Sequence, residues 1–261
     1  MNEFLEAGEQ AARAAGAILR RRQSQVRAWH KQPKDVVTEA DLEAQRIIQK
    51  MLLDAFPEHG FVGEEEWDGE LEAGQLLQHY CWIVDPLDGT TNYVHGLQNY
   101  AVSIALAHQG QIIAGVVYDP VADECFRASA GGGAWLNGDV LKTSNCHRMD
   151  EALVAASFAP GVDREAPDVR RFVEVLLESQ SVRRLGSAAL NMCYLAAGRL
   201  DAYWSSTVKV WDIAAGVLIV REAGGVVTGI DGAPFELTEP EFAAAATAPL
   251  LSDFLAVLAR C

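Results

Sequence analysis

Apolar residues recur at helical spacing in the first part of the chain. Residues 2 to about 28 are rich in alanine and have apolar positions three and four apart, which predicts a long amphipathic helix. Pro33 ends that pattern. Thr38 and Asp41 then form a capped start, so a second helix is predicted from Thr38. Residues 57–74 are acidic and turn-rich, and we expect a loop there.

From Cys81 onward the apolar runs shorten to the length of strands and are separated by turn residues. Gln109-Gly110 and Asn137-Gly138 predict tight turns. The first part of the chain is therefore expected to be α+β, with antiparallel hairpins. Its strands are predicted at residues 81–84, 100–107, 111–118, 124–128 and 133–136.

Beyond about Met149, strand-like and helix-like segments alternate, which is typical of an α/β arrangement. We divide the chain into an α+β half, residues 1–148, and an α/β half, residues 149–261. No linker composition separates them, so we expect them to pack as one unit. In the second half, strands are predicted at residues 153–158, 181–185, 202–204, 226–229 and 242–246, and helices at 166–178, 188–197, 213–223 and 249–258.

Composition and charge exclude several classes of function. The 261-residue chain has a formal net charge of −15 and no basic cluster that outweighs its acids, so direct nucleic-acid binding is not expected. Its five cysteines are widely spaced and contain no CxxC pair, which favours a reducing compartment. No apolar run approaches the ~18 residues that span a membrane, and the acidic N-terminus is not typical of a signal peptide. We expect a soluble, cytoplasmic protein.

Two aspartates directly follow the strand predicted at residues 81–84. Pro86 lies between Asp85 and Asp88, so we expect the chain to turn there and to present both carboxylates together. Neighbouring ionised carboxylates repel, and one would bind a proton unless a cation lay between them. Mg²⁺ prefers such oxygen ligands, and the Leu87 carbonyl is a further candidate. Asp-Pro and Asp-Gly are also ordinary turn dipeptides, so this stretch alone leaves a plain turn as the alternative.

Gly89 and Thr90 continue this stretch with the properties of a phosphate site. Gly89 allows the backbone to approach a ligand closely. A helical turn beginning at Thr90 would direct free N–H groups at phosphate oxygens, and the Thr90 hydroxyl would orient a water molecule. Carboxylates for a metal beside amides for a phosphate predict phosphoryl transfer.

Two further acidic residues are candidates for the same cluster. Glu64 belongs to the run 63–66 just before the strand, where an exposed acidic loop is the alternative. Asp212 precedes the apolar helix predicted from Ile213 and is expected to be its N-cap residue. That capping role would account for Asp212 without any ligand.

Together these motifs resemble those of the inositol monophosphatase family. The main matches are Gly-Glu-Glu at 63–65, Asp-Pro-Leu-Asp-Gly-Thr-Thr at 85–91, Trp-Asp at 211–212 and Glu-Ala-Gly-Gly at 222–225. Residues 38–41, 131–134, 137–138 and 184–189 also fit, so the resemblance covers about residues 30 to 230. It implies a layered αβαβα sandwich of the inositol monophosphatase and fructose bisphosphatase type. It also implies a homodimer and Mg²⁺ as cofactor, commonly with lithium inhibition.

The resemblance implies the ligands of the metal ions. Glu64, Asp85 and the Leu87 carbonyl are similar to the ligands of one metal. Asp85, Asp88 and Asp212 are similar to those of a second, with Asp85 bridging. Some family models add a third, weaker metal near Glu64, so the number of metals stays open.

The resemblance also implies a mechanism of hydrolysis by metal-activated water. The amides of Gly89 and Thr90 would hold the phosphate. Thr90 would position the attacking water together with Glu64 or Asp41, and the two partners are equal candidates. No covalent enzyme intermediate is needed.

Substrate contacts are implied as well, at Asp88, Gly89, Thr90, Thr91, Gly186, Ser187, Ala188, Ser205 and Asp212. In the family, an acid seven residues before the Trp-Asp aspartate binds inositol hydroxyls, whereas this chain has Ser205 there. Loss of that hydrogen-bond partner predicts a looser choice among small phosphorylated metabolites. Inositol monophosphate stays the first candidate.

Other functions share this pattern of residues. A phosphatase for another sugar phosphate, for histidinol phosphate or for fructose 1,6-bisphosphate would use the same metal ligands. Relatives that act on 3′-phosphonucleotides usually have lysine where this chain has Thr91, which argues against that branch. A regulatory binding protein that keeps the phosphatase fold and a general acidic Ca²⁺ binder are alternatives from other classes.

Overall fold

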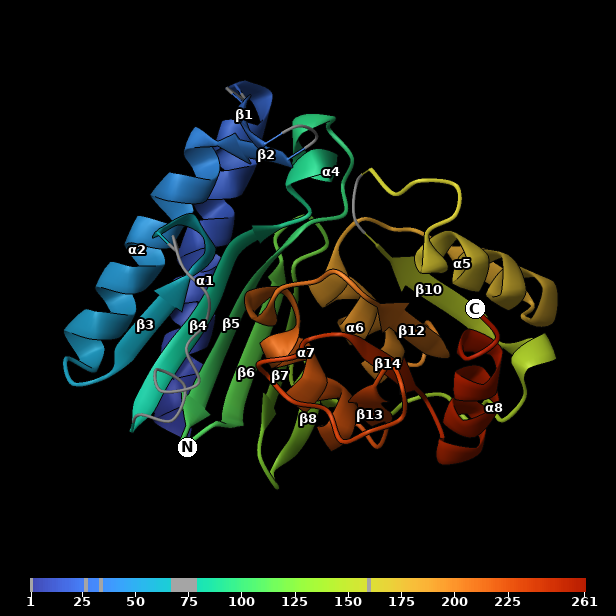
Figure 1. Cartoon of the computed structure of the whole chain (residues 1–261). Helices are drawn as coiled ribbons and strands as arrows, with labels where there is room; N and C mark the ends of the chain where they lie inside the picture. The colour runs from blue at the N-terminus through green and yellow to red at the C-terminus, as the bar shows by residue number, and fades with distance from the viewer. Residues whose placement is uncertain (1, 26–27, 33–34, 67–78, 159–160) are drawn as a thin grey trace.

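Helices and sheets alternate as helix, sheet, helix, sheet, helix from left to right in Figure 1. The computed structural model describes residues 2–25, 28–32, 35–66, 79–158 and 161–261. Its architecture is the layered α+β sandwich expected from the sequence. None of the helices in these residues is long and apolar enough to cross a membrane.

In the described part of the chain the larger sheet has seven strands, antiparallel except for the pairing of β3 with β4. In spatial order they are β3 (Gly60–Gly63), β4 (Tyr80–Asp88), β5 (Ala101–His108), β6 (Gln111–Asp119), β7 (Glu124–Ser129), β8 (Gly133–Leu136) and β9 (Asp139–Val140). The turns at residues 109–110 and 137–138 have positive φ throughout, which confirms the predicted hairpins.

The loop predicted for residues 57–74 is wrong in part. Residues 60–63 form β3, and Glu64–Glu66 form the 3₁₀ turn η2. β3 contains only two apolar residues, and it exists because it pairs with β4. Such a tertiary pairing leaves no periodic signal in the sequence. Residues 67–74 lie outside the described residues.

Two helices, α1 (Asn2–Arg22) and α2 (Glu39–Ala55), cover the outer face of the larger sheet (Figure 1). α1 ends six residues before the predicted boundary, with basic residues in its last turn that suit the helix dipole. Between α1 and α2 lies an unpredicted hairpin, β1 (Ala28–Gln32) and β2 (Asp35–Thr38). The predicted start of α2 is confirmed, because Thr38 caps it and Asp41 completes a capping box.

The smaller sheet contains the strands predicted for the second half of the chain. Its spatial order is β11 (Ser181–Arg183), β10 (Leu153–Ser157), β12 (Ala202–Ser205), β14 (Phe242–Ala245) and β13 (Val226–Gly229). β10 is parallel to both neighbours, and β14 is antiparallel to both of its own. Helices α5 (Pro167–Glu178) and α8 (Ala248–Leu258) pack on its outer side.

Helices α6 (Ala188–Ala196) and α7 (Val210–Glu222) form the layer between the sheets. α7 is buried continuously over residues 213–220, as expected for a helix enclosed on both sides. Glycines allow α7 to pack closely against α6 and against β6 of the larger sheet. A Cβ on Gly216 would lie 2.5 Å from Cβ of Met192, and a Cβ on Gly115 would lie 2.9 Å from the Ala215 carbonyl oxygen. Both halves of the chain therefore share this core, and their boundary at residues 148/149 stays a prediction.

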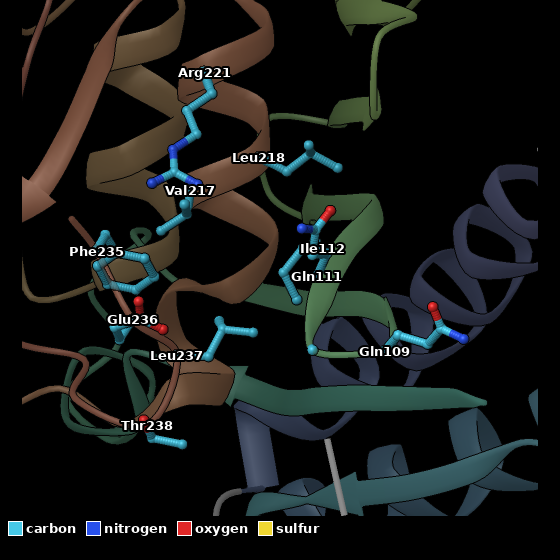
Figure 2. A pocket seen from close by; sticks show the side chains of 11 residues that line it. Gln109, Gln111, Ile112, Val217, Leu218, Arg221, Phe235, Glu236, Leu237 and Thr238 are labelled. Atoms are coloured by element: carbon cyan, nitrogen blue, oxygen red, sulfur yellow. The ribbon is translucent and has the colours of Figure 1, made fainter. Parts of the chain in front are cut away.

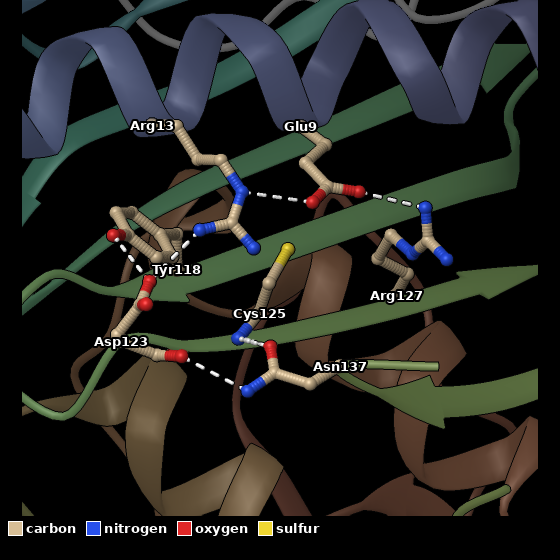
Figure 3. Close-up of polar contacts among 7 residues, drawn as sticks. All are labelled: Glu9, Arg13, Tyr118, Asp123, Cys125, Arg127 and Asn137. Carbon is tan, nitrogen blue, oxygen red and sulfur yellow. Dashed lines mark hydrogen bonds and ion pairs between the residues drawn. The ribbon is translucent and has the colours of Figure 1, made fainter. Parts of the chain in front are cut away.

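A polar network ties α1 to the larger sheet (Figure 3). Glu9 accepts hydrogen bonds from Nε of Arg13 at 2.8 Å and from an Nη of Arg127 at 2.7 Å. Arg13 also reaches Asp123, which accepts a hydrogen bond from the Tyr118 hydroxyl. The Glu9 side chain is only 23% exposed, so solvent screens these pairs less than ordinary surface pairs.

We expect Glu9→Gln to lower the free energy of unfolding by about 1 kcal/mol, because a partly buried acceptor for two guanidinium groups loses its charge. Urea denaturation of purified protein measures the change. The matched control is Asp54→Asn, which breaks the Lys50–Asp54 pair, whose side chains are 69% and 67% exposed. Equal losses in the two variants would show that the network adds nothing beyond a surface ion pair.

Candidate active site

Asp85 and Asp88 lie on β4, and no turn separates them. The prediction that the chain turns at Pro86 is wrong, since the strand continues to Asp88. Asp85 is opposite Ser103 and Asp88 is opposite Ala101, so one extra residue is inserted between them as a bulge. Proline is tolerated at a bulge because its missing N–H is not needed there.

The bulge matters because residues three apart on a regular strand point to opposite faces. One inserted residue restores the same face, so Asp85 and Asp88 can approach each other. Both carboxylates are buried, with Asp85 2% and Asp88 8% exposed.

Four carboxylates from distant segments act on one another here. Burial, followed by the charges of Glu64, Asp88 and Asp212, raises the pKa of Asp85 well above its usual value. Burial, then Asp88 and Glu64, likewise raises the pKa of Asp212, which also shares a side-chain hydrogen bond with Asp85. The acids that the sequence singled out are therefore brought together.

The acids of this cluster repel one another. Within the described residues, no three His, Cys, Asp or Glu side chains already stand close enough to hold a metal ion. The carboxylates are thus neighbours but not a closed set of ligands. Their oxygen chemistry and mutual repulsion fit a hard divalent cation.

Asp88 is held by the first turn of α6. The Ser187 hydroxyl donates to Oδ2 of Asp88, and the Ala189 and Ala188 amides donate to its two oxygens at 2.8 and 3.1 Å. Burial still dominates and raises the pKa of Asp88 to about 6. Ser187 is itself completely buried and caps α6 through Leu190 N.

Asp212 lies inside α7 and is not its N-cap residue, so that prediction is wrong. The helix begins at Val210, and Lys209 occupies the N-cap position. Asp212 is the third helical residue, and its Oδ2 accepts from Lys209 N at 2.8 Å. The prediction was wrong because an acid at the third helical position also accepts a hydrogen bond from a backbone N–H of the first turn, as an N-cap aspartate does. The Ser103 hydroxyl, on β5, donates to the Trp211 carbonyl at 3.1 Å and fixes this turn against the larger sheet.

The short helix α4 (Thr90–Val94) begins at Thr90, which confirms the predicted helical turn. Gly89 precedes it with φ 94°, a conformation that favours glycine. A Cβ on Gly89 would also lie 3.0 Å from the Asn99 carbonyl oxygen and 3.3 Å from that of Gly186. The backbone segments around Gly89 and Gly186 are therefore in close contact.

The Thr90 hydroxyl lies between two acceptors. Its distance is 3.0 Å to the Leu87 carbonyl and 3.3 Å to Oδ1 of Asp41. Asp41 is 1% exposed, and burial raises its pKa to about 6. Thr38 N and the Thr38 hydroxyl hold the other oxygen of Asp41 at 3.0 and 2.5 Å. The capping box of α2 thus also positions an acid beside Thr90.

Besides Asp88 and Asp212, the residues predicted to contact substrate fall into two groups by their exposure. Gly89 and Thr90 are partly exposed, and Thr91 and Gly186 are exposed. Ser187 and Ser205 are completely buried, and Ala188 is 7% exposed. Direct substrate contact by the buried group stays a prediction. The Ser205 hydroxyl accepts a hydrogen bond from the Thr207 amide at 3.5 Å.

Asn92 is a site residue that the sequence analysis missed. Its Nδ2 donates to the carbonyl oxygens of Asn99 and Leu185, both at 2.8 Å. It thereby joins α4 to the segment that leads into α6. The sequence feature that could have identified it is its position directly after the Asp-Gly-Thr-Thr motif, in the five-residue helix α4.

Comparison with known proteins identifies the class to which this fold and site belong. The model of the inositol monophosphatase family matches residues 1–260. The chain belongs to this family, and it is a phosphatase of that metal-dependent class.

Individual relatives agree with this assignment. An inositol-1-monophosphatase of Mesorhizobium japonicum is 44% identical over 227 residues, which cover 85% of this chain and 84% of that protein. The Nus factor SuhB of Xylella fastidiosa is 40% identical over 227 residues, with 85% and 80% covered. The crystal structure of the extragenic suppressor protein SuhB of Bartonella henselae has a TM-score of 0.90 at 36% identity, with 98% of each chain covered.

Ser187→Ala should lower kcat/KM by about tenfold, because Asp88 loses a hydrogen bond from a neutral donor to a charged acceptor. The cation concentration needed for half-maximal activity should rise as well. The α6 cap is also lost, at a cost of about 1 kcal/mol of stability. Activity is followed as phosphate release at several cation concentrations.

Thr247→Ala is the matched control for the lost cap, since Thr247 caps α8 through Leu250 N, outside the acidic cluster. It should lose similar stability and keep its activity. Unchanged activity and cation dependence in Ser187→Ala would show that Ser187 does not position Asp88.

Without divalent cations, the free energy of unfolding should rise as the pH falls from about 7.5 to about 5. The pKa values of Asp41 and Asp88 are about 6 in the folded chain against 3.8 ordinarily, so the folded state binds protons that the unfolded state does not. This contribution is absent well above pH 6, grows as the pH falls through 6, and is complete below the unfolded pKa.

Urea titrations in the presence of a chelator measure this gain. It should be smaller in Asp88→Asn, which removes one of the titrating groups. An identical gain in wild type and Asp88→Asn would exclude Asp88 as a group with a raised pKa.

Proposed function

We propose that this chain hydrolyses small phosphate monoesters with Mg²⁺ as cofactor, with inositol monophosphate as the first candidate substrate. The observation that carries the proposal is that Asp85 and Asp212 lie close enough to Asp88 and Glu64 for these acids to raise their pKa values. The turn at Gly89 and Thr90 directly follows these carboxylates. Metal ligands beside a phosphate-sized backbone turn are what phosphoryl transfer requires.

The proposed metal ligands are those implied by position in the family. Glu64, Asp85 and the Leu87 carbonyl would hold one cation, and Asp85, Asp88 and Asp212 a second. When bound, such cations neutralise charge on the phosphate and lower the pKa of a water molecule. The amides of Ala188 and Ala189 keep Asp88 oriented. Preorganised ligands of this kind lower the cost of assembling the site.

Thr90 and Asp41 are proposed to position the attacking water. The Thr90 hydroxyl lies within 3.3 Å of Oδ1 of Asp41, which supports Asp41 over Glu64 as its partner. The capping box fixes Asp41, so the hydroxyl has a defined orientation. A pKa of about 6 keeps Asp41 ionised at neutral pH, where it accepts a hydrogen bond from Thr90. The Gly89 and Thr90 amides would hold the phosphate.

Substrate choice is proposed to be broad. Ser205 supplies no carboxylate for vicinal hydroxyls, and its side chain is completely buried. A site without that acceptor discriminates weakly among polyols. Phosphates of other sugars, histidinol phosphate and fructose 1,6-bisphosphate remain alternative substrates.

A regulatory binding role is a second candidate, supported by the relatives named Nus factor SuhB. A regulatory role does not exclude catalysis, because this chain contains all four acidic residues proposed to bind metal ions. Absence of turnover on every ester, with Mg²⁺ binding retained, would favour this second role.

Asp85→Asn should reduce phosphate release by at least about 100-fold, because metal-centred stabilisation is typically worth several kcal/mol. The assay follows phosphate release from a panel of small esters, with and without Mg²⁺. Wild type should require Mg²⁺ and should turn over several esters, inositol 1-phosphate among them.

Asp253→Asn, at an exposed position on α8, is the control for loss of one negative charge and should keep full activity. Equal activity of Asp85→Asn and Asp253→Asn would refute the metal assignment. Full activity with a chelator present would refute the Mg²⁺ requirement.

A homodimer is also proposed, in line with the family resemblance. The exposed apolar side chains of Val173, Leu176 and Leu177 on α5 support it, with Leu177 74% exposed. Light scattering should give twice the chain mass of 28.3 kDa, and Leu177→Glu should shift it towards one chain. A wild-type mass of one chain would refute the dimer.

We also propose a cytoplasmic location, because all five cysteines are unpaired and disulfides are rare in the reducing cytoplasm.

A further inference from the structure

A cavity lies at the opposite end of α7 from the acidic cluster (Figure 2). It is bounded by the β5–β6 turn at residues 109–112, by the last turns of α7 and by the loop at residues 235–238. Its volume of about 620 Å³ is within the range of small-molecule sites. Asp212 and Arg221 are nine residues apart on α7, about 14 Å along the helix, so this cavity is separate from the candidate active site.

Arg221 gives the cavity its positive charge. Its guanidinium donates to the Val227 carbonyl at 3.3 Å and lies 5.7 Å from the centre of the Phe235 ring. Among the described residues, no ion pair is seen between Arg221 and a carboxylate. A guanidinium has five N–H donors, so several remain for a ligand.

The electrostatic setting of Arg221 also favours an anion. Partial burial lowers the pKa of the Arg221 guanidinium below its usual value. A bound anion would form charge-assisted hydrogen bonds with this guanidinium. Arg221 is an exposed residue, so an anion can reach it from solvent.

The remaining walls are largely apolar. Val217 and Leu218 present the side of α7, and Ile112, Phe235 and Leu237 are partly buried around it. In Figure 2 the Phe235 ring lies beside the guanidinium, with Leu237 further along the loop. A bare inorganic ion would leave this apolar surface unused.

One acidic residue limits the charge of the occupant. Glu236 also lines the cavity, on the side of Phe235 away from Arg221 in Figure 2. A single cation opposed by one carboxylate is poorly suited to a nucleotide or a polyphosphate. The wall chemistry therefore favours one negative charge and an apolar body.

We propose that this cavity binds a small organic monoanion with an aromatic or aliphatic group, its acidic end at Arg221 and its apolar part against Phe235 and Leu237. The site is independent of phosphate ester hydrolysis and uses none of the acidic residues of the candidate active site.

The test is a fluorescence titration of the full chain with 8-anilinonaphthalene-1-sulfonate, an aromatic monoanion. Wild type should show one saturable site. Arg221→Met should weaken binding at least tenfold, because the charge is lost while the length is kept. Glu236→Gln should tighten binding severalfold, because it removes the opposing charge. Arg183→Met, at an exposed arginine on β11, is the control and should bind as wild type does.

A second variant tests the same cavity in case Arg221→Met does not fold. Gln111→Trp keeps Arg221 and fills the cavity from an exposed position on β6, so it should abolish binding with an unchanged unfolding midpoint. In competition, 4-phenylbutyrate should displace the probe, whereas inorganic phosphate and 4-phenylbutan-1-ol should not. Binding unaffected by both Arg221→Met and Gln111→Trp would overturn the proposal. Equal displacement by phosphate or by the alcohol would also overturn it.

Discussion

Carboxylates that are held together and away from water repel one another, and the rest of the fold must supply the energy that keeps them in place. At the end of β4, burial raises the pKa values of Asp85, Asp88 and Asp212, and repulsion among the acids adds to the rise at Asp85 and Asp212. A chain that tolerates such a cluster gains from it only when a cation binds there. The metal dependence of the family and the arrangement of these acids therefore have the same physical origin.

The acids are held by different elements of the sandwich, and each element uses a local device. A bulge at Pro86 brings Asp85 and Asp88 to one face of β4. The first turn of α6 donates amides to Asp88, and the first turn of α7 contains Asp212. Both helices lie in the apolar layer between the sheets, where close packing leaves little freedom to move. Rigid support of this kind keeps charged groups close in spite of their repulsion.

Much of this arrangement could be predicted from the sequence, because most elements follow strong local patterns. The hairpin turns, the capping box of α2 and the alternating segments after Met149 are examples. The failures have specific causes. β3 and the β1–β2 hairpin are short and exist through pairing, which leaves no periodic signal. Pro86 suggested a turn where a bulge absorbs it, and Asp212 caps its helix from the third position. The hydrogen bond from Ser187 to Asp88 joins segments 99 residues apart, so only the fold could show it.

Calorimetric titration of the metal-free protein with Mg²⁺ tests the central claim most directly, because it detects cation binding without any substrate. We predict saturable binding by wild type and by Asp253→Asn, and its loss in Asp85→Asn. Near pH 6, binding should release protons, seen as a dependence of the heat on the buffer, since Asp88 has a pKa of about 6 in the folded chain. Equal Mg²⁺ binding by Asp85→Asn and wild type would contradict the account.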